Sequence, residues 1–121
     1  MLTTEIRLRL DEVGLDVSEM VDKFMNSEEM FLKYFRKFFS SADSVVQELE
    51  AAVNSADNAA VENRAHALKG LSGNIGLNGV YEPAKKIVDD VRAERFDSYR
   101  SDYDKLRAAY DKAKAIADEL N

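Results

Sequence analysis

Apolar residues recur along four stretches of the chain at intervals of three and four residues, the spacing of one buried stripe on an amphipathic helix. In the first and last stretches the intervals alternate strictly, so each stripe stays in phase over about six turns. The pattern therefore predicts four long helices. Their stripes consist of Phe31, Phe35, Phe38, Ala42, Val45, Leu49 and Ala52; Val61, Ala65, Leu68, Ser72 and Ile75; Val80, Ala84, Ile87 and Val91; and Tyr99, Tyr103, Leu106, Tyr110, Ala113, Ala117 and Leu120.

Polar residues that favour helix N-termini precede each stripe. The expected N-caps are Asn26, Asp57, Asn78 and Asp97. Glu29 follows the first of these by three residues, which is the spacing of a capping box. Gly76 is expected to end the second long helix, and Gly79 to help the chain enter the third. The single proline, Pro83, lies near the start of that third helix, where it does least harm.

The first ten residues fit two patterns. Ile6, Leu8 and Leu10 alternate as in a strand, whereas Leu2, Ile6 and Leu10 would share one helical face. We favour a short helix. Gly14 interrupts it, and the apolar spacing over residues 17–24 suits a further one or two turns.

These elements predict an all-α fold. Four amphipathic helices joined by short loops bury their stripes best as an antiparallel, up-down-up-down four-helix bundle, with one or two short extra N-terminal helices over one end. A chain of 121 residues holds one domain with a core, so we expect a single unit over residues 1–121.

Composition narrows the classes of function. The net charge of −6 argues against nucleic-acid or anionic-membrane partners, which reward a basic surface. The chain has no cysteine, so disulfides and thiolate metal sites are excluded. No apolar run is long enough for a membrane span, and the N-terminus lacks the apolar core of a signal peptide. We therefore expect a cytoplasmic protein.

Candidate chemistry centres on residues 66–79, which contain the only histidine, His66, and four of the five glycines. Each helical residue advances about 100°, so His66 projects away from the stripe through Ala65 and Leu68. Residues three and four positions away share its face, and these are Glu62, Asn63, Lys69, Gly70 and, one turn further, Gly73.

From spacing alone, two interpretations of His66 remain open. It is either an ordinary solvated residue or an exposed nucleophile, whose neutral ring keeps a free lone pair at cytoplasmic pH. On the second interpretation Lys69 offsets phosphoryl charge, and Gly70 and Gly73 leave a bare track for a partner. On the first, Lys69 is one of 17 basic residues and the two glycines permit close helix packing, although they face away from Leu68.

The segment RAHALKGLSGNIGL resembles the signature of histidine-containing phosphotransfer (HPt) domains. Seven positions match that pattern: His66, Leu68, Lys69, Gly70, Ser72, Asn74 and Gly76. The resemblance extends more loosely over residues 16–120. Tyr81 and Pro83 are less usual for the family, and residues 1–15 have no clear counterpart and form an N-terminal extension.

The resemblance implies that His66 is phosphorylated by the aspartyl phosphate of a receiver domain and passes the phosphoryl group to another receiver. Lys69 would assist electrostatically, Gly70 would supply clearance, and Ser72, Asn74 and Gly76 would support the helix and its end. The expected partners are receivers of response regulators and hybrid sensor histidine kinases. The receiver brings the magnesium ion, so the chain itself needs no cofactor, no ATP site and no second subunit. It would be a carrier, not an enzyme.

Two alternatives remain. The chain could be a substrate domain of a larger chemotaxis-type histidine kinase, or a helical adaptor that binds receivers without carrying phosphate.

Other features of the sequence give weaker indications of a functional site. The segment FLKYFRKFF is expected to be mostly core, with an exposed edge beside His66 as an apolar docking patch. The acidic pairs Asp89-Asp90 and Asp118-Glu119 are expected on solvated faces or helix ends. A metal or haem site in the bundle core is not expected, because such centres draw several ligands from facing helices.

Overall fold

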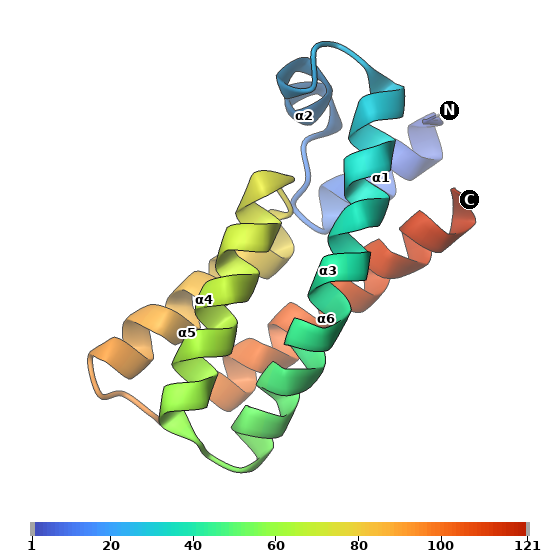
Figure 1. The fold of residues 1–121 in the computed structure, drawn as a ribbon. Helices are drawn as coiled ribbons and strands as arrows, with labels where there is room; N and C mark the ends of the chain where they lie inside the picture. The colour runs from blue at the N-terminus through green and yellow to red at the C-terminus, as the bar shows by residue number, and fades with distance from the viewer. Residues whose placement is uncertain (1, 121) are drawn as a thin grey trace.

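The computed structural model describes residues 2–120, which form six helices and no strand. Helices α3 to α6 run alternately up and down and pack in chain order, with α6 returning against α3 (Figure 1). This is the predicted antiparallel four-helix bundle, and α1 and α2 are two short N-terminal helices. The bounds are α1 (Thr4–Glu12), α2 (Val17–Lys23), α3 (Glu28–Asn54), α4 (Asn58–Asn74), α5 (Asn78–Arg92) and α6 (Tyr99–Glu119).

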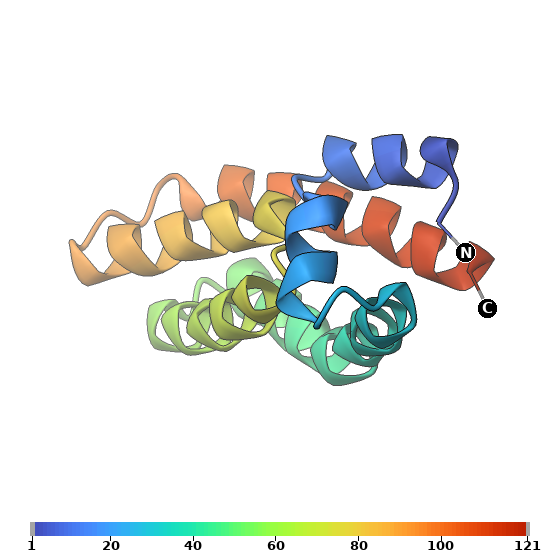
Figure 2. The ribbon, with the colours of Figure 1, turned by 90° about the horizontal axis from the view of Figure 1, so that it is seen from above.

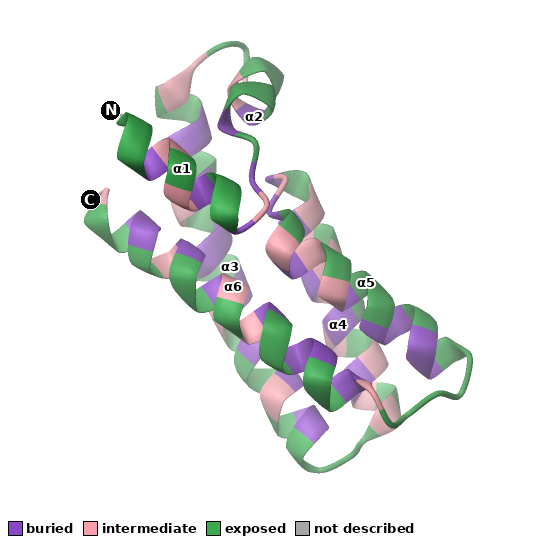
Figure 3. Cartoon of the chain, turned by 180° about the vertical axis from the view of Figure 1, so that it is seen from behind, coloured by how far each residue is buried: buried purple, intermediate pink, exposed green. Residues whose placement is uncertain are grey.

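The four predicted stripes form the core of the bundle (Figure 3). All their residues are buried except Leu120, which is half-buried near the end of the chain. Aromatic rings join α3 to α6: the ring of Phe39 stands edge-on to Phe35 at 5.2 Å and to Tyr110 at 5.4 Å between centroids. Such pairs add about 0.5–1.5 kcal/mol beyond the area they bury. Hydrophobic spacing thus predicts the core correctly.

Two helix ends agree with the sequence pattern and one differs. Asp57 caps α4, and Gly76 follows its end with φ of +67°, a left-handed conformation that a side chain would strain. The predicted cap at Asn26 is wrong. Ser27 caps α3 instead, accepting a hydrogen bond from the Met30 amide at 3.1 Å, while Asn26 lies in the preceding turn with φ of +61°.

The other two predicted caps are also wrong. Asn78 is the first residue of α5, and Leu77 in the cap position supplies no side-chain hydrogen bond. Asp97 lies before the cap position of α6, which Ser98 occupies. The Ser98 hydroxyl donates to Asp90 at 3.1 Å and leaves the helix amides uncapped. In both places tertiary contacts take over the groups that local capping would use.

The N-terminal segment forms the helix α1, as favoured over a strand. Its buried residues Ile6 and Leu10 face the bundle, and Leu8 on the other side is exposed. Helix α1 lies along the C-terminal part of α6 (Figure 2), where the Arg9 guanidinium binds the Glu119 carboxylate through two hydrogen bonds. Residues 2–15 therefore cover one end of the bundle.

The connection from α1 to α2 crosses the start of α5 at backbone distance. The Gly79 amide donates to the Val13 carbonyl at 2.8 Å. A Cβ on Gly79 would lie 2.5 Å from that carbonyl oxygen, and one on Gly14, at φ +81°, would lie 2.8 Å from the Gly79 nitrogen. Gly79 thus permits the N-terminal segment to dock, which corrects the expectation that it eases entry into the helix.

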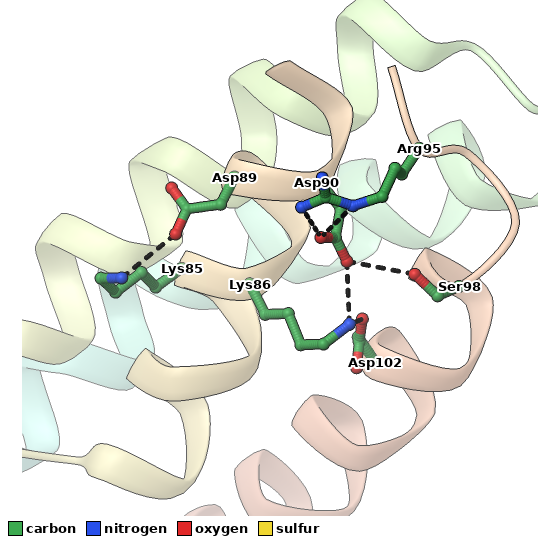
Figure 4. A network of polar contacts seen from close by, with 7 residues as sticks. All are labelled: Lys85, Lys86, Asp89, Asp90, Arg95, Ser98 and Asp102. Carbon is green, nitrogen blue, oxygen red and sulfur yellow. Dashed lines mark hydrogen bonds and ion pairs between the residues drawn. The ribbon is translucent and has the colours of Figure 1, made fainter. Parts of the chain in front are cut away.

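A polar network around two buried carboxylates joins α5 to α6 at the opposite end of α5 (Figure 4). Asp90 and Asp102 are 5% and 4% exposed. The Lys86 ammonium lies 2.8 Å from Asp90 and 3.0 Å from Asp102, and Arg95 donates to Asp90 at 2.7 Å. These hydrogen bonds, that of Lys86 foremost, lower the pKa of Asp90 to about 2. The prediction of a solvated Asp90 is wrong, whereas Asp89 is exposed.

Candidate functional site

Helix α4 presents His66 to solvent. Ala65, Leu68 and Ser72 on its inner face are fully buried, while the imidazole is exposed on the outer face. The side chain therefore points in the direction that the spacing predicts. No hydrogen bond or ion pair within residues 2–120 engages the ring, so no other side chain or backbone group of the described residues occupies its nitrogens.

The polar neighbours of His66 on α4 differ in whether another side chain binds them. The Glu62 carboxylate accepts from Arg92 of α5 at 3.4 Å, and the Asn63 amide oxygen accepts from Arg64 at 2.8 Å. The half-buried Lys69 is one turn away from His66 and forms no ion pair with any residue that the structure describes. Its ammonium is therefore free to meet an anion on the imidazole.

Gly70 and Gly73 have different surroundings. A Cβ on Gly70 would meet nothing within 4 Å, so this side of the imidazole is open. A Cβ on Gly73 would lie 3.2 Å from the Tyr81 ring, which is tighter than ordinary contact. The expected bare track therefore holds only at Gly70. Gly73 allows close packing of α5, and the unusual Tyr81 fills the space beside it.

The remaining predicted site residues, Ser72, Asn74 and Gly76, lie in the last turn of α4 or just past its end. The buried Ser72 hydroxyl donates to the Leu68 carbonyl at 2.8 Å, which satisfies it inside the core. A Cβ on Gly76 would meet the Met20 sulfur at 2.5 Å, so its lack of a side chain also lets α2 approach. Asn74 is exposed at the rim of a groove between α3 and α4.

That groove, of about 190 Å³, adjoins the outer face of α4. The phenylalanines of FLKYFRKFF are all buried, and Tyr34, 38% exposed, is the aromatic residue that the segment leaves at the surface. Its ring stacks on Phe24 at 5.1 Å between centroids. The groove is lined by Tyr34, Lys37, Phe38, Ser41, Leu71, Asn74 and Ile75.

Helix α5 adds a flank to the site that the sequence pattern did not reveal. Tyr81 contacts Gly73, and Arg92 binds Glu62, so α5 borders the His66 face on the side opposite to α3. Between them Lys85 pairs with Asp89 at 3.1 Å. The spacing of Tyr81, Lys85 and Arg92 at helical intervals is a signal, but it cannot show which helix the face meets.

The model of the Hpt domain family matches residues 33–116, more than two thirds of the chain, and includes α4 and His66. The chain belongs to the Hpt-domain family. Among curated proteins and solved structures, none matches it. Helices α1 and α2 precede the matched range of this Hpt domain. No helix within residues 2–120 is both long and apolar enough to cross a membrane.

Family membership carries a general role. Hpt domains are phosphotransfer modules of phosphorelay signalling that carry phosphoryl groups and interact with receiver domains of two-component systems. The four-helix bundle found here has the helical architecture of the family.

Proposed function

We propose that this Hpt domain is a histidine phosphotransfer protein of a multistep phosphorelay, with His66 as the residue that carries the phosphoryl group. The observation that supports this most is an exposed imidazole on α4, with Lys69 one turn away and an open position at Gly70. In this proposal the protein is a cytoplasmic monomer without an ATP site, because the receivers supply the phosphoryl group and the magnesium ion and one exposed histidine suffices to carry that group.

The chemistry needs one ring nitrogen with a free lone pair. That nitrogen attacks the phosphorus of a receiver's aspartyl phosphate. The P–N bond forms as the P–O bond to the aspartate breaks, and the carboxylate leaves with the electron pair. The proton on the other ring nitrogen passes to solvent, and the reverse sequence loads a second receiver. The receiver supplies the magnesium ion.

Lys69 and the exposed surface have separate roles in this proposal. Phosphoryl transfer depends on positioning and charge neutralisation, and Lys69 contributes to the second. Its contribution is below about 1 kcal/mol because the site is solvated. The groove at Tyr34 and the open side at Gly70 provide a surface on which a receiver can dock. Ser72 and Gly76 support the end of α4 through their contacts with Leu68 and Met20, and Asn74 lies at the rim of the groove.

The proposal is tested by incubating the protein with phosphorylated receivers and Mg²⁺. Acid-labile label is expected on the wild type and absent from His66→Gln, which keeps an exposed polar side chain at the same position. The protein is tested in this way against every receiver domain of its source organism. Binding without label on any of them would favour an adaptor that carries no phosphate.

Gly70→Ala tests the open side of the imidazole. Because the new methyl meets nothing, the variant should gain about 1 kcal/mol of helix stability. The same methyl lies where the receiver approaches, so transfer should slow roughly tenfold. Stability is measured by denaturant unfolding and transfer by rapid quench. Ser101→Ala, at an exposed position of α6, is the control for an alanine substitution away from the site. An unchanged transfer rate in Gly70→Ala would show that the receiver does not need open space at this position.

A further inference from the structure

Two contacts align α5 with α4 on either side of His66. At one end Gly73 lies against the Tyr81 ring, and at the other the Glu62 carboxylate binds Arg92. In an antiparallel pair, equal steps inward from two such contacts lead to the same level. The residues between them on α5 therefore lie beside His66 and Lys69.

Counting inward assigns the individual residues. Lys69 is four residues from Gly73, and Lys85 is four residues from Tyr81, so the two lysines lie at one level. His66 is four residues from Glu62, and Asp89 is three residues from Arg92, so the Asp89 carboxylate lies near the level of the imidazole. Neighbouring helices are about 8–10 Å apart, a gap that a lysine's four-carbon stem can cross.

The Lys85 side chain is on the α4 side of its helix. Figure 4 shows Lys85 and Asp89 together, turned away from the network that Lys86 forms with Asp90 and Asp102. The Lys85 ammonium is 3.1 Å from the Asp89 carboxylate, and both side chains are about half exposed, at 48% and 51%. The hydrogen bond to Asp89 raises the pKa of Lys85, so the ammonium stays charged.

We infer that Lys85 is a second cation for the phosphoryl group on His66, held by Asp89 until that group arrives. The inference rests on the proposed function. A phosphoryl group brings up to two negative charges to the level of Asp89. It competes with Asp89 for Lys85, and an exposed ion pair is weak enough to exchange. Lys85 and Lys69 then approach the group from the same side, and Asp89 repels it.

The test is the equilibrium constant for phosphoryl exchange between His66 and a receiver, measured with dilute free components so that docking does not enter. Lys85→Gln should lower this constant about threefold, and Asp89→Asn should raise it by a similar factor. Lys105→Gln is the control, because Lys105 is exposed on α6 and lies away from α4.

The double variant separates a direct role from an indirect one. If Lys85 meets the phosphoryl group, adding Lys85→Gln to Asp89→Asn should again lower the constant about threefold. If Lys85 only screens Asp89, the double variant will match Asp89→Asn, and the inference fails. If the wild type is labelled on His66 but Lys85→Gln has the same exchange constant as Lys105→Gln, the role of Lys85 is overturned and the proposed function stands. A wild type that takes no label on His66 overturns the proposed function as well.

Discussion

Gly79→Ala is expected to destabilise the protein by about 2 kcal/mol, although alanine is the better helix former. The new Cβ would lie 2.5 Å from the Val13 carbonyl oxygen and 3.1 Å from the Ala109 Cβ. Relief requires the α1–α2 connection to move, which lengthens the hydrogen bond from the Gly79 amide to Val13. Overpacking of this kind costs about 1–3 kcal/mol, and the weakened hydrogen bond adds about 0.5–1.5 kcal/mol.

The measurement is thermal and urea unfolding beside Gly70→Ala, the same substitution at an open helix position. Gly79→Ala should melt roughly 8 °C lower, while Gly70→Ala should melt slightly higher than the wild type. Amide exchange should quicken in α1 of Gly79→Ala, because that helix docks through this crossing. Equal shifts in the two variants would show that the N-terminal segment does not approach α5 as described.

Asp90→Asn is expected to cost about 2 kcal/mol at neutral pH and to remove part of the protein's acid sensitivity. In the folded protein the pKa of Asp90 is lowered from 3.8 to about 2 by its hydrogen bonds to Lys86, Arg95 and Ser98. A lowered folded pKa stabilises the protein above the unfolded value. That stability is fully present above about pH 5 and is lost as the pH falls towards 2.

Urea unfolding between pH 7 and pH 2 measures this contribution. The stability of the wild type should fall through that window more steeply than that of Asp90→Asn, and the two curves should converge at the acid end. Asp89→Asn is the matched control, because its carboxylate is exposed and pairs with Lys85 outside the network. Parallel curves for wild type and Asp90→Asn would mean that the network does not hold the carboxylate in its charged form.

The long helices could be predicted because their signal is local. Each stripe is a repeat within one helix, and it is buried whatever that helix packs against. Caps such as Asn78 and Asp97 failed because neighbouring residues compete for the same role and tertiary contacts decide between them. The Val13 carbonyl accepts a hydrogen bond from the Gly79 amide, and the Asp90 carboxylate accepts one from the Ser98 hydroxyl.

The features of the site also fall into those that depend on one helix and those that depend on how two helices pack. The outward direction of His66 and the open position at Gly70 follow from the turn of one helix. The contact of Gly73 with Tyr81 and the position of Lys85 depend on how α5 is aligned with α4, and no repeat within either helix contains that alignment. Asp90 was missed for a related reason, since a carboxylate is buried only where cations from other positions surround it.

We propose that His66 holds a phosphoryl group between two receivers. The most direct measurement maps the labelled residue by mass spectrometry under neutral conditions, after reaction with a phosphorylated receiver, and follows the label when a second, unphosphorylated receiver is added. We predict one acid-labile phosphate, bonded to a ring nitrogen of His66, that moves to the second receiver. Phosphate on another residue, or a phosphohistidine that no receiver can discharge, would contradict it.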